Sequence, residues 1–369
     1  MRQDLFSIPL RRCSRAALVA AIIGWSALVG AGTTAAPAID VVATLPTYAA
    51  IAREVAGDRA DVSAIARGDE DPHFVNPRPS FAVRIQQADL FIATGLDLEL
   101  WVPGLLDRAN NPGVVESAPG HVAAYAGIEL LEVPTTVSRA GGDVHVFGNP
   151  HIHTDPINGI LIARNIRDGL VRVDPAGRET YESRTRDFET RVLQRLFGER
   201  LVDMLGEEVL FSLARNRQFW TFAEGRSFEG RPLADLVGGW LGRGAPFRGR
   251  EMGCYHKNWA YFSARFQIEC AAFIEPKPGI PPSPGHVAEV ISIMRERSIR
   301  VLFAANYFNR RQVETVAERS GAMPLFVPEH VAGAPGVDDY FALVDRWVEC
   351  LAAAYEGRPV ASACGSGGS

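Results

Sequence analysis

Residues 39–94 have the sequence IDVVATLPTYAAIAREVAGDRADVSAIARGDEDPHFVNPRPSFAVRIQQADLFIAT, and this stretch determines the fold class. Short apolar runs rich in Val, Ile and Ala alternate here with helical patterns: runs at 41–44, 62–66 and 90–94, helical patterns at 48–55 and 80–88. Strand, helix, strand in this rhythm is typical of a parallel sheet covered by helices. The stretch therefore predicts an α/β lobe.

A second series of the same kind begins near residue 251. It predicts a strand that ends at 255, further strands at 268–274, 301–304 and 324–327, and helices at 259–266, 288–296, 312–319 and 340–354. The chain is thus expected to form two α/β lobes, each a small parallel sheet flanked by helices. The N-terminal lobe spans residues 39–173 and the C-terminal lobe residues 251–360.

Two helical patterns lie between the lobes. Each opens with an acidic residue and a proline at the first helical position: Asp155 with Pro156, and Asp174 with Pro175. In the second pattern, apolar residues recur at helical spacing between Tyr181 and Leu196 among many charges, which indicates an exposed helix with one buried stripe. We expect a long rigid connector helix over residues 174–198. An insertion over residues 199–250, rich in glycine and aromatic residues, is expected to form a small local core.

The N-terminus has the pattern of a secretory signal peptide. An apolar run from Ala16 to Ala31 follows three arginines and precedes small residues that end at Ala38. The run is shorter than the roughly 20 residues of a spanning helix, so a membrane anchor is the less favoured alternative. Cys13 precedes the run instead of ending it, which offers no cysteine for lipid attachment. We expect cleavage of residues 1–38 and a soluble periplasmic protein with no membrane span in the mature chain.

The composition narrows the possible functions. The 369 residues are 47% hydrophobic and 22% charged, as in ordinary globular proteins, which excludes disorder, collagen and coiled coil. The formal charge of −5 becomes more negative when the arginine-rich N-terminus is removed, so nucleic acid is not an expected partner. We expect a monomer with a disordered tail at residues 361–369.

Export would permit disulfides among the four cysteines of the mature chain: Cys254, Cys270, Cys350 and Cys364. The sequence does not choose their pairing. Cys254 and Cys270 fall in consecutive predicted strands and could be neighbours.

The positions of the histidines are the informative feature of the sequence. His73 lies in the loop GDEDPHFVNPRPS after a predicted strand, and His256 follows a predicted strand of the second lobe. His151 and His153 lie in GDVHVFGNPHIHTDP, with His145 upstream, just before a predicted helix. Ligands of open α/β sheets bind outside the carboxyl ends of strands, so both lobes are expected to direct imidazoles into one cleft. Neutral imidazoles suit zinc, copper, iron and nickel, and we expect zinc.

Three motifs resemble those of a known family, the metal-binding solute receptors of ABC importers for zinc and manganese. They are DPHFVNPRPS around His73, GDVHVFGNPHIHTDPINGILIARNI around His151, and CYHKNWAYFSARF followed by EPKPGIPPSP around His256. The resemblance covers essentially the whole mature chain and implies two α/β lobes joined by a long rigid helix. It implies that His73, His151 and His256 are metal ligands. Manganese-type members commonly have a carboxylate at the position of His256, so the resemblance favours zinc.

The resemblance also implies a fourth, acidic ligand in the loop PLFVPEHVAG after the last strand of the second lobe. Glu329 is the tentative candidate, His330 is the runner-up, and water is a further alternative. His153 stands where the family usually has an aromatic residue, and its approach to the metal beside His151 is a less favoured alternative. His145 is expected to be a surface histidine, with an auxiliary role at the metal site as the alternative. The long histidine-rich loop of many zinc-specific relatives is missing between residues 121 and 145.

We therefore expect a periplasmic receptor, not an enzyme, that captures Zn²⁺ as transported ligand between the lobes and delivers it to the permease of an ABC importer. A zinc-dependent hydrolase with a three-histidine site is one alternative, because three histidines and a water molecule are also the ligands of catalytic zinc. The chain lacks a HExxH motif, however, so Glu329 or Glu275 would have to act as the general base of such an enzyme. A structural surface protein without selective metal binding is the other alternative.

Overall fold

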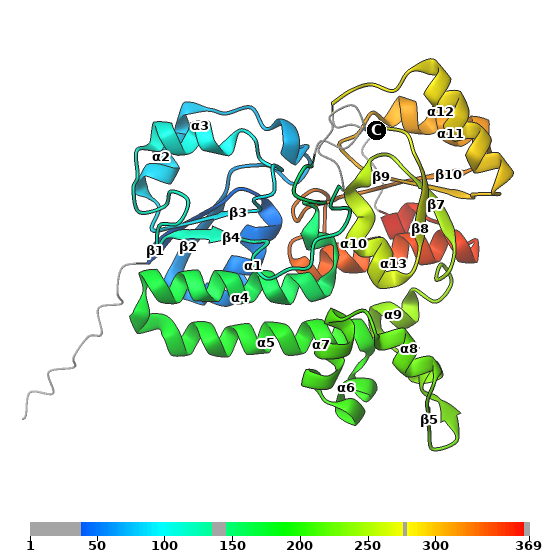
Figure 1. Ribbon diagram of the computed structural model, residues 1–369, viewed down its shortest axis with the longest axis horizontal. Coiled ribbons are helices and arrows are strands. Elements are labelled where there is room, and N and C mark those ends of the chain that lie inside the picture. Colours follow the sequence, from blue (N-terminus) through cyan, green and yellow to red (C-terminus); the bar gives the residue numbers. More distant parts are fainter. Residues whose placement is uncertain (1–37, 135–144, 276–278, 365–369) are drawn as a thin grey trace, which may run out of the picture. The chain divides into compact units, whose positions relative to one another are not determined.

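Two parallel four-stranded sheets form the centres of two lobes in the computed structural model, which describes residues 38–134, 145–275 and 279–364 (Figure 1). The strand orders are β2-β1-β3-β4 and β8-β7-β9-β10. The strands are β1 (Ile39–Ala43), β2 (Ala60–Ala64), β3 (Leu90–Ala93) and β4 (His121–Ala123) in the first sheet, and β7 (Glu251–Cys254), β8 (Glu269–Phe273), β9 (Val301–Ala305) and β10 (Met323–Val327) in the second. The predicted α/β fold with two lobes is confirmed.

Helices flank both sheets. Those of the first lobe, with its 3-10 turns, are α1 (Pro46–Ala56), η1 (Gly57–Arg59), η2 (Pro72–Phe74), α2 (Pro79–Gln87), α3 (Val102–Ala109), η4 (Ile152–Thr154) and α4 (Pro156–Val173). Those of the second are η7 (Lys257–Trp259), α10 (Ala260–Phe266), α11 (Pro284–Glu296), α12 (Arg310–Ser320), α13 (Tyr340–Glu356) and α14 (Ala361–Cys364). Proline begins α1, α2, α4 and α11, at a position where its missing N–H removes no helical hydrogen bond. Within the described ranges, each helix is too short or too polar to span a bilayer.

The long helices α4 and α5 (Arg178–Phe197) lie side by side, and α5 takes the chain from the first lobe toward the second (Figure 1). Asp155 caps α4 as predicted, because its carboxylate accepts a hydrogen bond from the backbone N–H of Ile157. The predicted cap of α5 at Asp174 is wrong. A 3-10 turn, η5 (Pro175–Gly177), lies between Asp174 and the helix, and the Asp174 carboxylate accepts hydrogen bonds from Arg59 and Tyr181 instead.

The segment 199–250 forms short elements that pack against the long helix α5 and, in part, against α13 of the second lobe. They are α6 (Glu199–Leu205), α7 (Glu207–Arg215), α8 (Phe219–Glu224), a hairpin of β5 (Ser227–Phe228) and β6 (Arg231–Pro232), η6 (Leu233–Leu236) and α9 (Gly239–Arg243). Its two fully buried aromatic rings do not form a separate core. Trp240 stacks against Phe341 of α13, and Phe247 stacks against Phe262 of α10. The expectation of a local core is therefore wrong for these residues.

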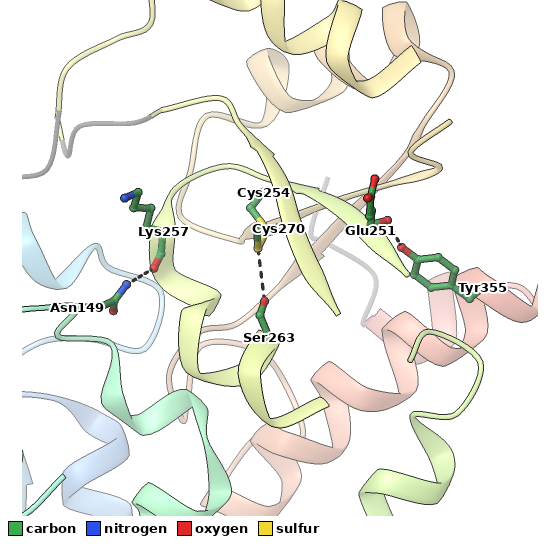
Figure 2. Close-up of a disulfide and its surroundings, with 7 residues drawn as sticks. All are labelled: Asn149, Glu251, Cys254, Lys257, Ser263, Cys270 and Tyr355. Atoms are coloured by element: carbon green, nitrogen blue, oxygen red, sulfur yellow. Dashed lines mark hydrogen bonds between the residues drawn. A yellow bond between two sulfur atoms is a disulfide. The ribbon is translucent and has the colours of Figure 1, made fainter. Parts of the chain in front are cut away.

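Two disulfides lie in the second lobe. Cys254 at the end of β7 is bonded to Cys270 in the adjacent strand β8, so the two cysteines of the consecutive predicted strands are indeed neighbours (Figure 2). Cys350 of α13 is bonded to Cys364 of α14. The predicted signal peptide, apart from Ala38, and residues 365–369 of the predicted tail lie outside the described residues. Residues 361–364 of that tail form α14, which the disulfide ties to α13, so the expectation of disorder is wrong for them.

Candidate metal centre

Four histidines from separate loops converge between the lobes. One ring nitrogen from each of His73, His145, His151 and His256 lies within 4.8 Å of the others. The first three come from loops of the first lobe, and His256 follows β7 of the second. The structure thus brings together the three histidines that the sequence predicts as ligands, and it adds His145.

His73 lies in η2, where Asp71 fixes both its backbone and its ring. A single carboxylate oxygen of Asp71 accepts hydrogen bonds from the backbone N–H of His73 at 3.0 Å and from Nδ1 of its ring at 2.9 Å. The indole of Trp101 donates to the carbonyl of Pro72 at 2.8 Å and holds the same turn. Because Nδ1 carries the donated proton, Nε2 of His73 is the nitrogen with a lone pair to offer.

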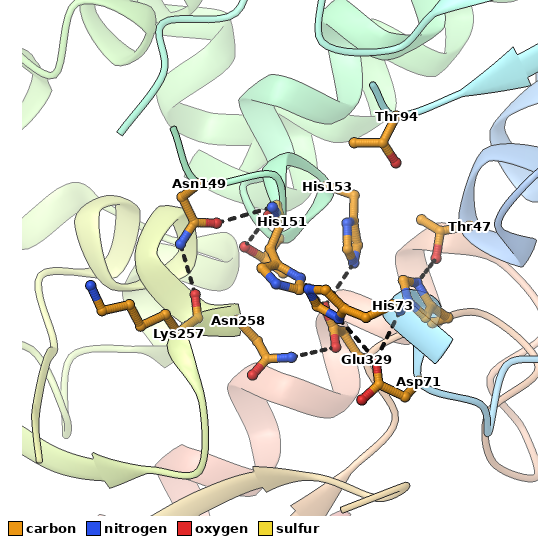
Figure 3. A network of polar contacts seen from close by, with 12 residues as sticks. Thr47, Asp71, His73, Thr94, Asn149, His151, His153, Lys257, Asn258 and Glu329 are labelled. Atoms are coloured by element: carbon orange, nitrogen blue, oxygen red, sulfur yellow. Dashed lines mark hydrogen bonds and ion pairs between the residues drawn. The ribbon is translucent and has the colours of Figure 1, made fainter. Parts of the chain in front are cut away.

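His151 is held by groups from both lobes. Its backbone N–H donates to Oδ1 of Asn149, whose amide nitrogen donates to the carbonyl of Lys257 in the second lobe (Figure 3). Its ring donates from Nδ1 to Glu329 at 2.8 Å. Nε2 of His151 is buried and has no hydrogen-bond partner among the described residues. The lone pair of this nitrogen is therefore available to a metal ion.

His256 repeats this arrangement in the second lobe. Its Nδ1 donates to the backbone carbonyl of Glu275 at 3.0 Å, and its buried Nε2 has no hydrogen-bond partner within the described ranges. Burial and the nearby imidazoles of His151 and His73 lower the pKa of His256 to about 3. The ring is therefore neutral at neutral pH and offers its lone pair without losing a proton.

His145 is only 3% exposed, so the expectation of a surface histidine is wrong. Its Nε2 lies 3.3 Å from Nε2 of His73. Burial and the neighbouring imidazoles, His151 foremost, lower its pKa to about 2. No local pattern in the sequence signals this position, because the contact between residues 145 and 73 depends on how two distant loops pack.

Glu329, the tentative fourth ligand, lies behind His151 and outside the group of four histidines. One carboxylate oxygen accepts the proton on Nδ1 of His151, and the other accepts hydrogen bonds from Asn258 and Tyr307. Burial alone would raise the pKa of Glu329, but its interaction with His151, including the hydrogen bond from Nδ1, holds it well below its usual value. The ionised carboxylate therefore places a negative charge across the His151 ring from Nε2, the nitrogen that is available to a metal ion.

The three predicted ligands share one hydrogen-bonding pattern. Nδ1 of each ring donates to a fixed acceptor: the carboxylates of Asp71 and Glu329 and the carbonyl of Glu275. Histidines that bind metals almost always donate their other ring N–H in this way, which fixes the tautomer and the ring orientation. The arrangement therefore suits a cation that prefers nitrogen donors, and two carboxylates balance its charge without direct contact.

Comparison with known proteins agrees with this chemistry. The family model described as zinc-uptake complex component A, periplasmic, matches residues 41–196 and 241–354. The chain belongs to this family. Because the family consists of components of an uptake complex, the chain is a binding protein and not an enzyme.

Proteins similar to this chain differ in the metal that their names state. The iron-binding protein YfeA of Yersinia pestis is 25% identical over 349 residues, which cover 92% of this chain and 95% of that protein. The manganese ABC transporter substrate-binding lipoprotein PsaA of Streptococcus anginosus is 27% identical over 43% of this chain and 50% of that protein.

Solved structures show the same fold. A crystal structure of ZnuA matches with a TM-score of 0.63 at 20% identity, over 86% of this chain and 99% of that chain. The manganese-bound periplasmic metal binding protein from Candidatus Liberibacter asiaticus matches with a TM-score of 0.60 at 18% identity, also over 86% and 99%.

Proposed function

We propose that this chain captures Zn²⁺ in the periplasm with high affinity and delivers it to the permease of an ABC importer. The observation that carries the proposal is the convergence of imidazoles whose Nδ1 atoms are already hydrogen-bonded to fixed acceptors. Such a site needs little ordering when the ion replaces its water shell, so affinity is not lost to reorganisation. Membership in the zinc-uptake family supports the transport role.

Nitrogen donors support zinc over manganese as the cargo. Manganese prefers carboxylate, carbonyl and water oxygens, whereas imidazole suits zinc, copper, iron and nickel. Four imidazoles approach one another here, and the two carboxylates contact the imidazoles instead of joining the group. We therefore assign zinc to this chain, although relatives are named for iron and manganese.

We assign the four ligands to His73, His145, His151 and His256. His145 takes the fourth position because its Nε2 approaches that of His73, whereas Glu329 is engaged by hydrogen bonds on both of its oxygens. In this assignment Glu329 orients His151 and does not bind the ion in this group.

Zinc competition titration of the mature chain, purified without a metal-binding tag, tests the site. Apparent binding energies of about 10–16 kcal/mol for four-ligand zinc sites suggest roughly 3 kcal/mol per ligand, or more than about 100-fold in affinity. We expect that loss in His73→Ala, His151→Ala and His256→Ala, and a comparable loss in His145→Ala. The control is His286→Gln on α11, outside the group of four histidines. Affinity indifferent to all four substitutions, or tighter for manganese than for zinc, would refute the assignment.

The delivery step is tested in the cell. Deleting the gene is expected to lower zinc accumulation and growth under chelator-imposed zinc limitation, and the wild-type gene should restore both. Failure of the His256→Ala gene to complement, at normal protein abundance, would link transport to the four-histidine site. Unchanged zinc accumulation in the deletion strain would argue against the transport role.

A further inference from the structure

A second group of potential ligands lies deeper between the lobes. His153 from η4 of the first lobe meets Glu329 and His330 from the loop after β10 of the second, and one ligand atom from each lies within 4.8 Å of the others. All three residues are 0% exposed. Nε2 of His153 lies 3.6 Å from Oε1 of Glu329 (Figure 3). The rings of His153 and His330 stack with centroids 4.7 Å apart.

Three nitrogens of this deep group have no hydrogen-bond partner among the residues that the structure describes: Nδ1 and Nε2 of His153, and Nε2 of His330. A buried donor or acceptor without a partner costs about 1–3 kcal/mol. Native proteins rarely leave such groups unsatisfied, and an unaccounted ion or water is a usual explanation. Two imidazoles beside a carboxylate are a donor set found in metal sites, and here one ligand atom from each lies within 4.8 Å of the others.

The surroundings of the deep group hold its members in place. Tyr340 donates from its hydroxyl to the carbonyl of His153 at 2.9 Å, and the ring of Tyr48 meets that of His153 edge-on. Thr47 is hydrogen-bonded to Nδ1 of His330, which leaves Nε2 as the nitrogen without a partner. The three side chains are therefore positioned in advance, as a binding site requires.

Glu329 has capacity for a further ligand. Its Oε1 accepts one hydrogen bond from His151, while Asn258 and Tyr307 both donate to Oε2. A carboxylate oxygen has two lone pairs, so Oε1 can accept from His151 and bind a cation on its other side. The carboxylate thus contacts the four-histidine group through a hydrogen bond and the deep group directly.

We propose that His153, Glu329 and His330 form a second metal site, for a divalent cation of zinc type. Tetrahedral zinc with bonds of about 2.0–2.1 Å to nitrogen places its donors about 3.4 Å apart, so small ring rotations close the present separations. The proposal goes beyond the proposed function, since it adds a second ion per chain on different ligand atoms. Its failure and the failure of the four-histidine site can therefore be told apart.

The test counts zinc ions per chain. The mature protein is stripped with chelator, equilibrated with excess zinc and washed in zinc-buffered solution, and zinc is then measured by mass spectrometry. We expect two ions in the wild type, one in His153→Phe and His330→Phe, which preserve an aromatic ring, and two in the control His286→Gln. The ion left in the two phenylalanine variants should bind as tightly as in the wild type.

Anomalous diffraction at the zinc edge on wild-type crystals is the second measurement, because it needs no substitution that could impair folding. Two peaks, one of them between His153 and His330, are expected. A single ion in the wild type that His153→Phe does not remove, or two ions in both phenylalanine variants, would overturn the second site. If that single ion is lost in His256→Ala and kept in His153→Phe, the proposed function stands. If His153→Phe removes the only ion and His256→Ala does not, the deep site stands and the proposed function falls.

Discussion

The two lobes share a strand order but contribute differently to the site. Each sheet has its second strand at one edge, followed by the first, third and fourth. The first lobe supplies His73, His145 and His151 from loops beside this sheet, whereas the second supplies His256 and the buried carboxylate of Glu329. The shared sheet thus acts as a scaffold, and the loops at its strand ends determine the chemistry of each lobe.

The lobes also differ in how they are held. All four cysteines after the predicted signal peptide lie in the second lobe, where they form its two disulfides. The loops of the two lobes touch at Gly68 and Gly333, where a Cβ on either residue would come within 2.4 Å of the other's backbone. Neither lobe completes the group of four histidines alone, so the contacts between the lobes are part of the proposed metal site.

The largest expected effect tests the contact that joins the lobes. Asp155 at the start of α4 accepts two hydrogen bonds of 2.8 Å from Arg265 of α10, and both side chains are less than 10% exposed. Asp155→Ala leaves the guanidinium buried without its partner and is expected to cost about 3–5 kcal/mol of unfolding free energy. Chemical denaturation of the metal-free protein measures this loss.

Two variants control for this effect. Adding Arg265→Met to Asp155→Ala should restore part of the stability, because no charge is then left unpaired. Glu349→Ala removes a carboxylate from the exposed pair with Arg358 and should cost less than about 1 kcal/mol. Equal losses in Asp155→Ala and Glu349→Ala would mean that the buried pair does not hold the lobes together.

The next largest effect is expected from the Cys254–Cys270 disulfide, which cross-links the second lobe only. Replacing Cys254 and Cys270 together by alanine opens a loop with a sequence separation of 16. The entropy of a loop of about 15 residues corresponds to about 3 kcal/mol of stability. Amide hydrogen exchange should become faster in β7–β10 of the second lobe and change little in β1–β4 of the first. Equal acceleration in both lobes would show that they unfold as one unit.

The sequence predicts the frame of the molecule better than its interior contacts. Alternating apolar runs and helical patterns locate the strands of both sheets, because their periodicity is local, but the short edge strand β4 and helix α3 escape notice. The resemblance to metal receptors predicts His73, His151 and His256 as ligands, and the structure brings these three histidines together. His145 contacts His73, which lies 72 positions earlier in the chain, and His151 donates a hydrogen bond to Glu329, which lies 178 positions later. No local pattern in the sequence encodes such contacts.

A smaller effect compares the carboxylates that the lobes place behind the metal ligands. Glu329→Gln keeps the shape but removes the negative charge hydrogen-bonded to His151, and partners of this kind are worth about 10–100-fold in metal affinity. Asp71→Asn is the matched change behind His73, and its side chain is 24% exposed whereas that of Glu329 is 0%. Solvent screens the more exposed charge, so zinc titration should show a smaller loss for Asp71→Asn. A larger loss of zinc affinity in Asp71→Asn than in Glu329→Gln would mean that the buried charge of Glu329 does not strengthen zinc binding through His151.

The smallest effect tests whether imidazoles from both lobes are held neutral in the metal-free protein. Burial lowers the pKa of His145 to about 2, of His256 to about 3 and of His330 to about 4. The unfolded chain titrates near 6.5, so unfolding takes up protons and the folded protein loses stability as pH falls. As the pH falls from about 7.5 to about 6.5, each group lowers the free energy of unfolding by about 0.3 kcal/mol, or by about 1 kcal/mol for the three together.

The pH dependence can be divided between the lobes by substitution. Of the three imidazoles, His145 belongs to the first lobe and is removed by His145→Gln. The other two belong to the second lobe and are removed by the double change His256→Gln with His330→Gln. Denaturation at several pH values should therefore show a smaller reduction of the pH slope in the first variant than in the second. An unchanged slope in both variants would mean that these rings are not held buried and neutral in the metal-free protein.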